Sequence, residues 1–308
     1  MLGIRFTSWA LALLPHSWAM TLARRIGDAW YYLVPIRRRV ALDNVRRVFG
    51  GRLSDAERRS IVRRSCQNLA MSAVEILRLP YDMERNPALV AIAGREHLDA
   101  ALAKGRGVIL ACSHAGNIDL LGVSLALRGY PFYAIVKKLH WKALDDFVQD
   151  TRRRSGTSVI GTRGTGRQLR EVLASGATVL WAIDQHMPRR SGIVCSLFGR
   201  LASTTPAPAR FAQVTGAALV PAQLVRVERS GRHALRIEPE LLLERPSEDP
   251  DANVRYNTER LNRIVERWVE GTPELWLWQH RRWRVEEDPT RWEIPEDLLP
   301  ALSGSARS

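Results

Sequence analysis

The spacing of apolar residues divides the chain into three regions. Residues 7–35 are apolar almost throughout, residues 39–79 repeat their apolar positions with the period of a helix, and residues beyond 88 alternate short apolar runs with helical stretches. Such alternation is typical of a mostly parallel sheet with helices on both faces. We therefore predict an α/β fold with a central, mostly parallel sheet flanked by helices.

The individual elements follow from the same periodicity. A capping box from Ser54 to Glu57 opens a helix that runs towards Leu79. The pattern also predicts strands over 89–93, 107–112, 132–136, 159–160, 178–183 and 232–238, and helices over 39–50, 98–103, 118–127, 141–153, 168–173 and from 206 onwards. Since no internal repeat is present, we expect one large α/β domain after an N-terminal helical segment.

The N-terminal region is apolar but interrupted. Pro15 and His16 break its first half and Arg24 and Arg25 its second, so no run reaches the roughly 20 apolar residues that a transmembrane helix needs. We predict a membrane-associated helical segment over residues 1–36, with Trp and Tyr side chains at the headgroup level. A buried pair of core helices is the alternative. A signal peptide is disfavoured because no small-residue cleavage site follows.

Residues 37–300 are then expected to form the α/β domain, and the polar residues 301–308 a flexible tail. The composition indicates an anionic partner: 46 Lys and Arg stand against 32 Asp and Glu, a formal charge of +14, and most of the positive charge is arginine. Nucleic acid, anionic lipid and an acidic protein all fit this charge. The 3 cysteines are isolated in apolar surroundings, which predicts reduced core residues of a cytosol-facing protein and no metal-ligand spacing.

The candidate chemistry centres on residues 107–119. A buried strand delivers His114 into a turn of small residues, and a helix opens after Asn117. Gly116 can adopt the backbone conformation that turns Asp119 back towards the imidazole. Two other histidines have an acid five positions later, but one pair lies on a continuous helix and the other on opposite faces of a strand.

We therefore take His114 and Asp119 as the catalytic pair, because ligands bind at the carboxyl edge of the sheet in open α/β folds. A solvated or hydrogen-bonded structural histidine is the alternative. Asp184 and Gln185 also follow directly on a predicted strand.

Other charged and polar residues gather near the ends of predicted helices. Thr204 or Thr205 can cap the helix that starts at Pro206, and a helix N-terminus that faces a cleft can bind an anion. The arginines at 152–154 lie near a helix end, where they can also be solvated residues that complement the helix dipole. The run over 275–284 interleaves aromatic and cationic residues, a pattern that in isolation suits stacking on single-stranded nucleic acid. Beside an apolar N-terminus, it favours a membrane interface or a tail docked on the core.

With these residues placed in order, the chain resembles the bacterial lipid A biosynthesis acyltransferases, the late acyltransferases within the lysophospholipid acyltransferase superfamily. The resemblance rests on the order and spacing of segments 38–45, 113–119 with the family's His-x4-acid motif, 152–156, 184–185, 198–205 and 273–283. It implies a glycerolipid-acyltransferase-like fold and transfer of a fatty acyl group from an acyl thioester to a hydroxyl of a lipid A precursor or related membrane lipid.

The implied reaction agrees with the chemistry of the residues. An alcohol is a poor nucleophile, so a base must remove its proton, and a neutral imidazole beside a carboxylate suits that task. We assign the base to His114 and its orientation to Asp119. The remaining candidates are expected around the donor or the acceptor, without individual roles: Asn117, Arg152, Arg154, Asp184, Gln185, Thr204 and Thr205.

The resemblance also implies the partners. The donor is expected to be acyl carrier protein or acyl-coenzyme A, the acceptor a membrane lipid, and the surface an anionic membrane at the cytoplasmic face of the bacterial inner membrane. No nucleic acid, metal or redox cofactor is expected, and the acyl thioester counts as a co-substrate.

Departures from the family widen the choice of acceptor. Members more often carry Glu at the position of Asp119 and Pro at that of Ile183, which weakens assignment to the subgroup that acylates lipid A itself. The chain also lacks the Pro-Glu-Gly-Thr-Arg-like segment that relatives use for glycerol-phosphate acceptors, which argues against a lysophosphatidic acid acceptor. A lysophospholipid, aminolipid or glycolipid acceptor is the alternative within the class. A non-catalytic basic protein that binds membrane or nucleic acid is the alternative outside it.

Overall fold

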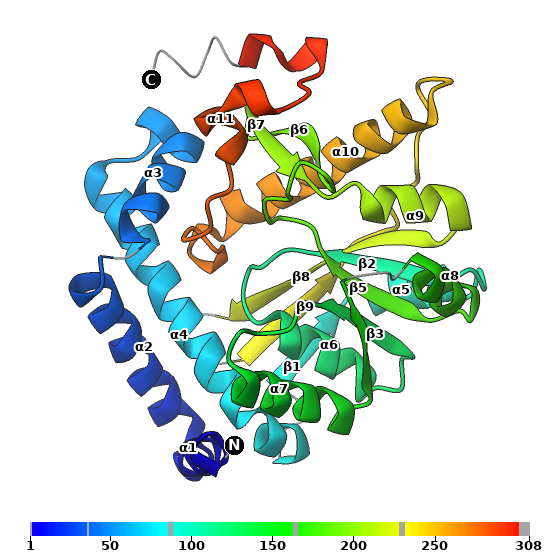
Figure 1. Cartoon of the computed structure of the whole chain (residues 1–308). Coiled ribbons are helices and arrows are strands. Elements are labelled where there is room, and N and C mark those ends of the chain that lie inside the picture. Colours follow the sequence, from blue (N-terminus) through cyan, green and yellow to red (C-terminus); the bar gives the residue numbers. More distant parts are fainter. Residues whose placement is uncertain (1, 36, 86–88, 163–165, 228–231, 302–308) are drawn as a thin grey trace.

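The computed structural model describes residues 2–35, 37–85, 89–162, 166–227 and 232–301 (Figure 1). Its strands are β1 (Val90–Ala93), β2 (Val108–Cys112), β3 (Phe132–Val136), β4 (Thr157–Gly161), β5 (Thr178–Ala182), β6 (Ile193–Leu197), β7 (Arg200–Thr204), β8 (Ala218–Val227) and β9 (Arg232–Ile237). Its α-helices are α1 (Leu2–Leu13), α2 (His16–Leu33), α3 (Arg38–Phe49), α4 (Asp55–Arg85), α5 (Arg95–Leu102), α6 (Ile118–Ala126), α7 (Lys142–Arg154), α8 (Gly166–Ala174), α9 (Ala207–Thr215), α10 (Pro250–Gly271) and α11 (Arg284–Glu287). Short 3-10 turns lie at 50–52, 273–275, 289–291 and 296–298.

The main sheet has 7 strands in the order β1-β9-β8-β2-β5-β3-β4. Every neighbouring pair is parallel except β8 and β9, which run antiparallel. Strands β6 and β7 form a separate antiparallel pair. The prediction of an α/β fold with a mostly parallel sheet flanked by helices is therefore confirmed.

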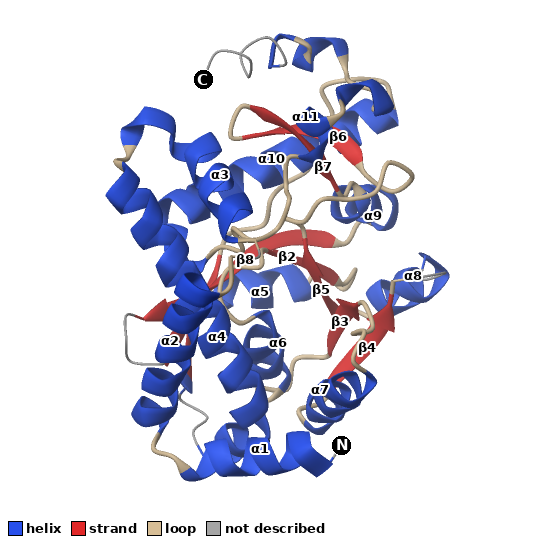
Figure 2. Cartoon of the chain, turned by 60° about the vertical axis from the view of Figure 1, so that its left-hand side comes forward, coloured by secondary structure: helices blue, strands red, loops and turns tan. Residues whose placement is uncertain are grey.

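The core lies on both faces of this sheet. Because successive side chains of a strand point to opposite faces, Ile109 and Ala111 of β2 enter the cluster that includes side chains of α8, α9 and α10, whereas Leu110 and Cys112 enter the one shared with α5 and α6. Figure 2 shows α9 and α10 on one side of the sheet and α5 and α6 on the other. The 3 cysteines are free and buried, as predicted.

The N-terminal helices lie along α4, which Figure 1 shows as the long helix at the side of the sheet. Gly27 lets α2 approach closely, since a Cβ there would lie 2.4 Å from the Cα of Gln67. Ala19, Met20 and Ala23 pack against α4, while the outer faces of α1 and α2 leave large apolar side chains exposed. None of the helices in the described residues has the length and apolar character to cross a bilayer. Membrane association of the segment stays a prediction.

The aromatic run near the C-terminus is docked on the core. Trp276, Trp278 and Trp283 are buried, and the rings of Trp276 and Trp278 meet edge to face at 4.7 Å between centroids. The side-chain amide of Asn44 donates to the carbonyls of Trp278 and His280, each at 2.8 Å, which ties α3 to this segment. The docked-tail interpretation is therefore confirmed. Residues 302–308 of the predicted tail lie outside the described residues.

Candidate active site

Two neighbouring strands deliver the two central side chains. β2 and β5 pair in parallel up to Cys112 and Ala182, and the amide of Ile183 still donates to the carbonyl of Cys112 at 2.9 Å. Beyond this last pair, each strand is followed by two more residues, which end at His114 and Asp184. This brings His114 and Asp184 together at the carboxyl edge of the sheet, although 70 positions separate them in the sequence.

Asp184 holds His114 through both its backbone and its ring. Oδ2 of Asp184 accepts the amide of His114 at 2.8 Å, and Oδ1 lies 2.6 Å from Nδ1 of the imidazole. Since an ionised carboxylate only accepts hydrogen bonds, Nδ1 carries the proton and Nε2 keeps its lone pair. Within the described residues Nε2 has no hydrogen-bond partner, and the side chain is 26% exposed, so this nitrogen can meet a substrate.

Trp276 completes the surroundings of the carboxylate, donating its Nε1 proton to Oδ2 of Asp184 at 2.8 Å. Burial raises the pKa of Asp184, but the charge and hydrogen bonds of His114 outweigh it and the pKa is lowered. For His114, burial lowers the pKa, and the Asp184 carboxylate outweighs this effect so that the pKa is raised. The pair is thus an ionised carboxylate against a ring whose protonated form it stabilises.

The turn after His114 is fixed by Gly116. Its φ of 75° lies in the left-handed region, and a Cβ at this position would be 2.8 Å from the carbonyl oxygen of Leu224 in β8. Its amide donates to the carbonyl of Leu275 at 3.2 Å. The turn of small residues is therefore clamped between the sheet and the C-terminal segment.

Asp119 does not hold the imidazole. It lies in the first turn of α6, and its Oδ1 is 2.7 Å from Nε and 2.6 Å from Nη2 of Arg152 on α7. Because a guanidinium offers two donors at once, the carboxylate faces α7 instead of the histidine. The prediction that Asp119 orients His114 is therefore wrong, and Asp184 makes that contact. The charge of Asp119 still helps to raise the pKa of His114, after the larger effects of burial and Asp184.

Two further predicted residues, Asn117 and Arg154, have different surroundings. Asn117 is buried, caps α6 by accepting the amide of Leu120 at 3.2 Å, and donates to Glu75 at 3.2 Å. Arg154 points away, with a side chain that is 63% exposed and lies 3.5 Å from Asp150. The geometry therefore does not favour contact between Arg154 and a substrate at this centre.

The remaining candidates lie beyond β5. Gln185 follows Asp184 and is half-buried. Thr204 is buried and its hydroxyl accepts from Nη2 of Arg282 at 2.6 Å, whereas the hydroxyl of Thr205 accepts the amide of Ala207 at the start of α9, at 3.4 Å. The helix begins one residue later than predicted, with Pro206 at the N-cap and no side-chain cap, so Thr205 satisfies only the amide of Ala207. Substrate contacts of Gln185, Thr204 and Thr205 stay predictions.

Sequence analysis missed His280. Its Nε2 accepts the amide of His186 at 2.8 Å, so the ring carries its proton on Nδ1. Burial lowers the pKa of His280 to about 4, which keeps the ring neutral near pH 7. His186 follows Asp184 by two residues, and Trp276 of the same segment as His280 donates to Asp184, so this segment runs beside the central pair. His280 lies in the aromatic run over 275–284, which the sequence analysis interpreted only through its tryptophans and arginines.

A buried ionic cluster beneath the turn was also missed. Glu75 of α4 pairs with Arg226 of β8, whose Nη2 donates at 3.0 Å, and lies 3.0 Å from Nε2 of His233 on β9. Burial raises the pKa of Glu75, but Arg226 and His233 outweigh it and the pKa falls to about 2. Since Glu75 also accepts from Asn117, the cluster joins α4, the sheet and the start of α6. In the sequence, Glu75 could have been noticed as an acidic residue beside the apolar face of the helix predicted to run towards Leu79.

An apolar pocket of about 600 Å³ opens beside the Asp119 and Arg152 pair. It lies between α1, α4 and α7, and apart from that pair its walls are mostly apolar: Ile4, Ala73, Ile76, Leu77, Leu139, Trp141, Leu144 and Val148. A pocket of this size and lining suits a flexible apolar chain.

Comparisons with known proteins identify relatives. Residues 2–285 match the family model described as bacterial lipid A biosynthesis acyltransferase. The chain is 34% identical over 153 residues to the phosphatidylinositol mannoside acyltransferase of Mycobacterium tuberculosis, an alignment that covers 48% of either protein, so it spans about half the length of that relative.

Two Escherichia coli K12 proteins match over more of their length. The chain is 26% identical over 280 residues to the lipid A biosynthesis palmitoleoyltransferase, covering 90% of this chain and 88% of that one. It is 23% identical over 289 residues to the lipid A biosynthesis lauroyltransferase, covering 92% of each.

Proposed function

Because the chain belongs to the bacterial lipid A biosynthesis acyltransferase family, we propose that it transfers a fatty acyl group from an acyl thioester to a hydroxyl of a membrane lipid. The observation that carries the proposal is the His114 and Asp184 pair, in which Nδ1 is bound by the carboxylate, Nε2 keeps its lone pair and the His114 side chain is partly exposed. A buried carboxylate that fixes the tautomer of a partly exposed imidazole is the arrangement that general-base catalysis needs.

In the proposed reaction, Nε2 of His114 takes the proton of the acceptor hydroxyl while its oxygen attacks the thioester carbonyl. The tetrahedral intermediate collapses, the carbon–sulfur bond breaks, and the departing thiolate takes the proton back from the imidazolium. Asp184 stabilises that imidazolium through the bond to Nδ1. Atoms and charges balance without a metal or redox cofactor, and the acyl thioester is a co-substrate.

The oxyanion of the intermediate needs a hydrogen-bond donor. We propose the Nδ1–H of His280 as this donor. Its Nε2 accepts the His186 amide, so the ring proton is on Nδ1, and a pKa of about 4 keeps the ring neutral near pH 7. The apolar pocket between α1, α4 and α7 is proposed to hold the acyl chain, since it opens beside Asp119, five residues after His114 in the chain.

The acceptor is proposed to be a lipid A precursor or a related membrane lipid. Two kinds of relatives support this range, those named for lipid A biosynthesis and those named for phosphatidylinositol mannoside. A lysophospholipid, aminolipid or glycolipid is the alternative acceptor. Acyl carrier protein or acyl-coenzyme A is the proposed donor, and the proposed place of action is the cytoplasmic face of the bacterial inner membrane.

The test is release of free thiol by the purified protein in detergent, with palmitoyl-carrier-protein or palmitoyl-coenzyme A as donor and a panel of lipid acceptors. Transfer by the wild type should depend on an acceptor and fall at least a hundredfold in His114→Ala, because the general base is lost. His140→Ala, a change at an exposed histidine, is the control and should keep wild-type rates.

Full turnover by His114→Ala would contradict the proposal. Absence of transfer with every pair, together with salt-sensitive binding to DNA, would instead favour a non-catalytic basic protein.

A further inference from the structure

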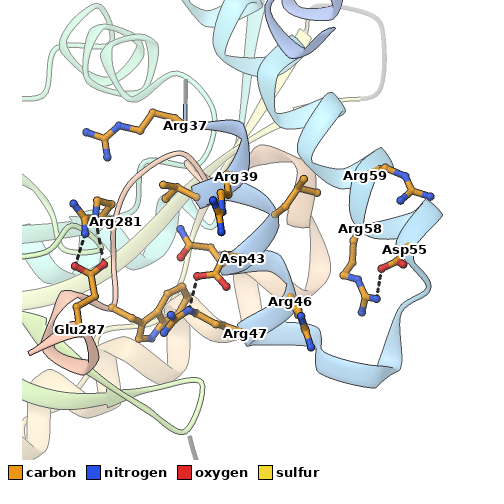
Figure 3. A pocket seen from close by; sticks show the side chains of 14 residues that line it. Arg37, Arg39, Asp43, Arg46, Arg47, Asp55, Arg58, Arg59, Arg281 and Glu287 are labelled. Atoms are coloured by element: carbon orange, nitrogen blue, oxygen red, sulfur yellow. Dashed lines mark hydrogen bonds and ion pairs between the residues drawn. The ribbon is translucent and has the colours of Figure 1, made fainter. Parts of the chain in front are cut away.

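A second pocket, of about 770 Å³, lies between α3, the start of α4 and the segment that carries Arg281 (Figure 3). Its charged lining consists of seven arginines and three carboxylates: Arg37, Arg39, Arg46, Arg47, Arg58, Arg59 and Arg281 with Asp43, Asp55 and Glu287. We call it the arginine pocket. Such an excess of one charge around a single hollow creates a strong positive potential.

The carboxylates neutralise only part of this lining. Arg47 pairs with Asp43, Arg58 with Asp55, and Arg281 with Glu287, as the dashed lines of Figure 3 mark. Within the described residues the four remaining arginines of the lining have no ion pair: Arg37, Arg39, Arg46 and Arg59. These guanidinium groups therefore keep their donors available for an anion.

Another pocket lined by arginines, between β6, α10 and residues 292–295, is built differently. It measures about 910 Å³ and has four arginines against three carboxylates in its lining. Arg189 pairs with Glu293, Arg210 with Asp251, and Arg255 with Asp297. Positive side chains at that pocket are largely neutralised, which makes it a suitable control surface.

The arginine pocket adjoins the candidate active site. Asn44 of its lining donates to the carbonyls of Trp278 and His280, each at 2.8 Å, and the charge of Arg37 helps to lower the pKa of His280. Figures 1 and 2 agree that α3 lies on one side of the carboxyl edge of β2 and β5, with α1 and α7 on the other. A substrate whose acyl chain enters the apolar pocket can thus extend past His114 towards the arginines.

We propose that the arginine pocket binds a phosphate group carried by one of the two substrates of the proposed transfer. A guanidinium fork matches the oxygens of a phosphate, and several unpaired guanidinium groups around one hollow suit a phosphate, which presents more acceptor oxygens than a carboxylate. The volume of about 770 Å³ is that of a small-molecule site, which favours a phosphate-bearing arm or headgroup over the surface of an acidic protein. The proposal rests on the proposed function, because it assigns the phosphate to a donor or an acceptor.

Calorimetric binding of soluble probe pairs tests the proposal without turnover. Coenzyme A and pantetheine form the donor pair, and dihexanoylphosphatidylinositol and dihexanoylglycerol form the acceptor pair. The variant Arg46→Ala/Arg59→Ala removes two unpaired arginines. Arg189→Ala/Arg210→Ala removes two exposed arginines of the other pocket as the control, and Arg46→Lys/Arg59→Lys keeps the charge without the fork.

We expect at least one phosphate-bearing probe to bind the wild type at least tenfold more tightly than its phosphate-free partner. Arg46→Ala/Arg59→Ala should abolish that preference, the lysine variant should restore part of it, and the control should leave it unchanged. A preference for coenzyme A assigns the pocket to the donor, and a preference for the phosphatidylinositol assigns it to the acceptor.

Equal binding of both members of each pair, or equal loss in the control variant, would overturn the proposal. So would binding of carrier protein without its phosphopantetheine arm that depends on Arg46 and Arg59, because this would make the pocket a protein-docking surface. The thiol-release assay with His114→Ala judges the transfer reaction independently, so the two failures are distinguishable.

Discussion

At the scale of single residues, the bonds of Asp184 determine the chemistry of His114. The contact to Nδ1 fixes the tautomer, and the contact to the amide fixes the position of the same residue. Trp276 holds the second oxygen in place. The carboxylate is thus committed entirely to His114, the proposed base, and to its support, while Asp119 is committed to Arg152.

Asp184→Asn should therefore lower kcat by about a thousandfold, because an amide neither stabilises the imidazolium nor selects the tautomer. Asp119→Asn should reduce turnover by a smaller factor, because it breaks the ion pair with Arg152 at the apolar pocket.

The proposed base, His114, must be neutral to accept a proton, so turnover falls as the pH drops through its raised pKa. The acid limb of the pH profile of the wild type should therefore lie above the ordinary histidine value of 6.5.

In Asp184→Asn burial still lowers the pKa of the ring while the carboxylate is gone, so the acid limb should move to lower pH. A pH profile of kcat/KM for the two variants and the wild type measures both effects. A larger loss in Asp119→Asn than in Asp184→Asn would contradict the assignment.

The sequence places His114 at the carboxyl end of a buried strand, because an apolar run that ends in small residues marks such an end. It does not identify the partner, since local patterns carry no information on which strands are neighbours. Asp119 is favoured by its nearness in sequence, whereas Asp184 reaches His114 only because β5 lies beside β2 in the sheet. A long-range pairing of this kind depends on the whole fold.

At the scale of elements, α4 connects the N-terminal helices to the sheet. Its start follows the predicted capping box: the amide of Ser54 donates to Glu57 at 2.8 Å, and the amide of Glu57 donates back to the Ser54 hydroxyl at 3.3 Å. Its middle carries Glu75 into the ionic cluster with Arg226 and His233. The helix is therefore held both by apolar packing and by buried charges.

Glu75→Gln should destabilise the protein by about 3 kcal/mol, because it leaves the guanidinium of Arg226 buried without a counter-charge. Urea unfolding followed by circular dichroism measures the change. Glu171→Gln, which breaks an exposed pair with Arg167, is the control and should cost less than about 1 kcal/mol. A loss of similar size in both variants would show that the buried cluster does not stabilise α4 on the sheet.

Filling the apolar pocket should change which acyl chains are accepted. Ala73 is an exposed residue of α4 in the wall of the pocket, so Ala73→Trp adds a large side chain there without crowding a buried position. We expect the preferred chain to become shorter, with at least a tenfold loss for palmitoyl relative to lauroyl donors in a competition assay. Ala56→Trp, at another exposed position of α4, should leave the preference unchanged. Unaltered selectivity in Ala73→Trp would place the chain elsewhere.

Most of the predicted helices and strands were found because each has a strong local period, but α10 and the strands β6, β7 and β8 were not predicted. The antiparallel direction of β9 against β8 and the order of the strands were not predictable, since both depend on packing between distant segments. The run over 275–284 shows the same limit. Its alternating tryptophans and arginines suit several environments, and only the core around Trp278 determines which one is occupied.

At the scale of the whole molecule, the exposed apolar side chains concentrate on α1 and α2. The large ones include Leu2, Phe6, Trp9, Leu13, Trp18, Leu22, Ile26, Tyr32 and Leu33. The apolar pocket opens beside α1 as well. A face of this kind, next to the proposed acyl site, suits insertion into the headgroup region of a membrane.

Phe6→Ser/Trp18→Ser should reduce binding to phosphatidylglycerol vesicles at least tenfold, because each side chain buries apolar area in the bilayer. Sedimentation with the vesicles measures the bound fraction. Val214→Ser/Leu242→Ser replaces two side chains of similar exposure away from these helices and should bind as the wild type does. Equal binding of both double variants would remove the N-terminal helices from the membrane contact.

The parallel pairing of β2 with β5 also determines how this protein can diversify. His114 and Asp184 meet because each lies two residues past the last pair of the ladder, so the turns between them, such as those at Gly129 and Gly156, can gain or lose residues without separating the two. One residue inserted between Cys112 and His114 would turn the imidazole towards the other face of the sheet. Over evolution, loops around the carboxyl edge of the sheet can therefore change to suit new lipid acceptors. The stretches 112–114 and 182–184 must keep their length.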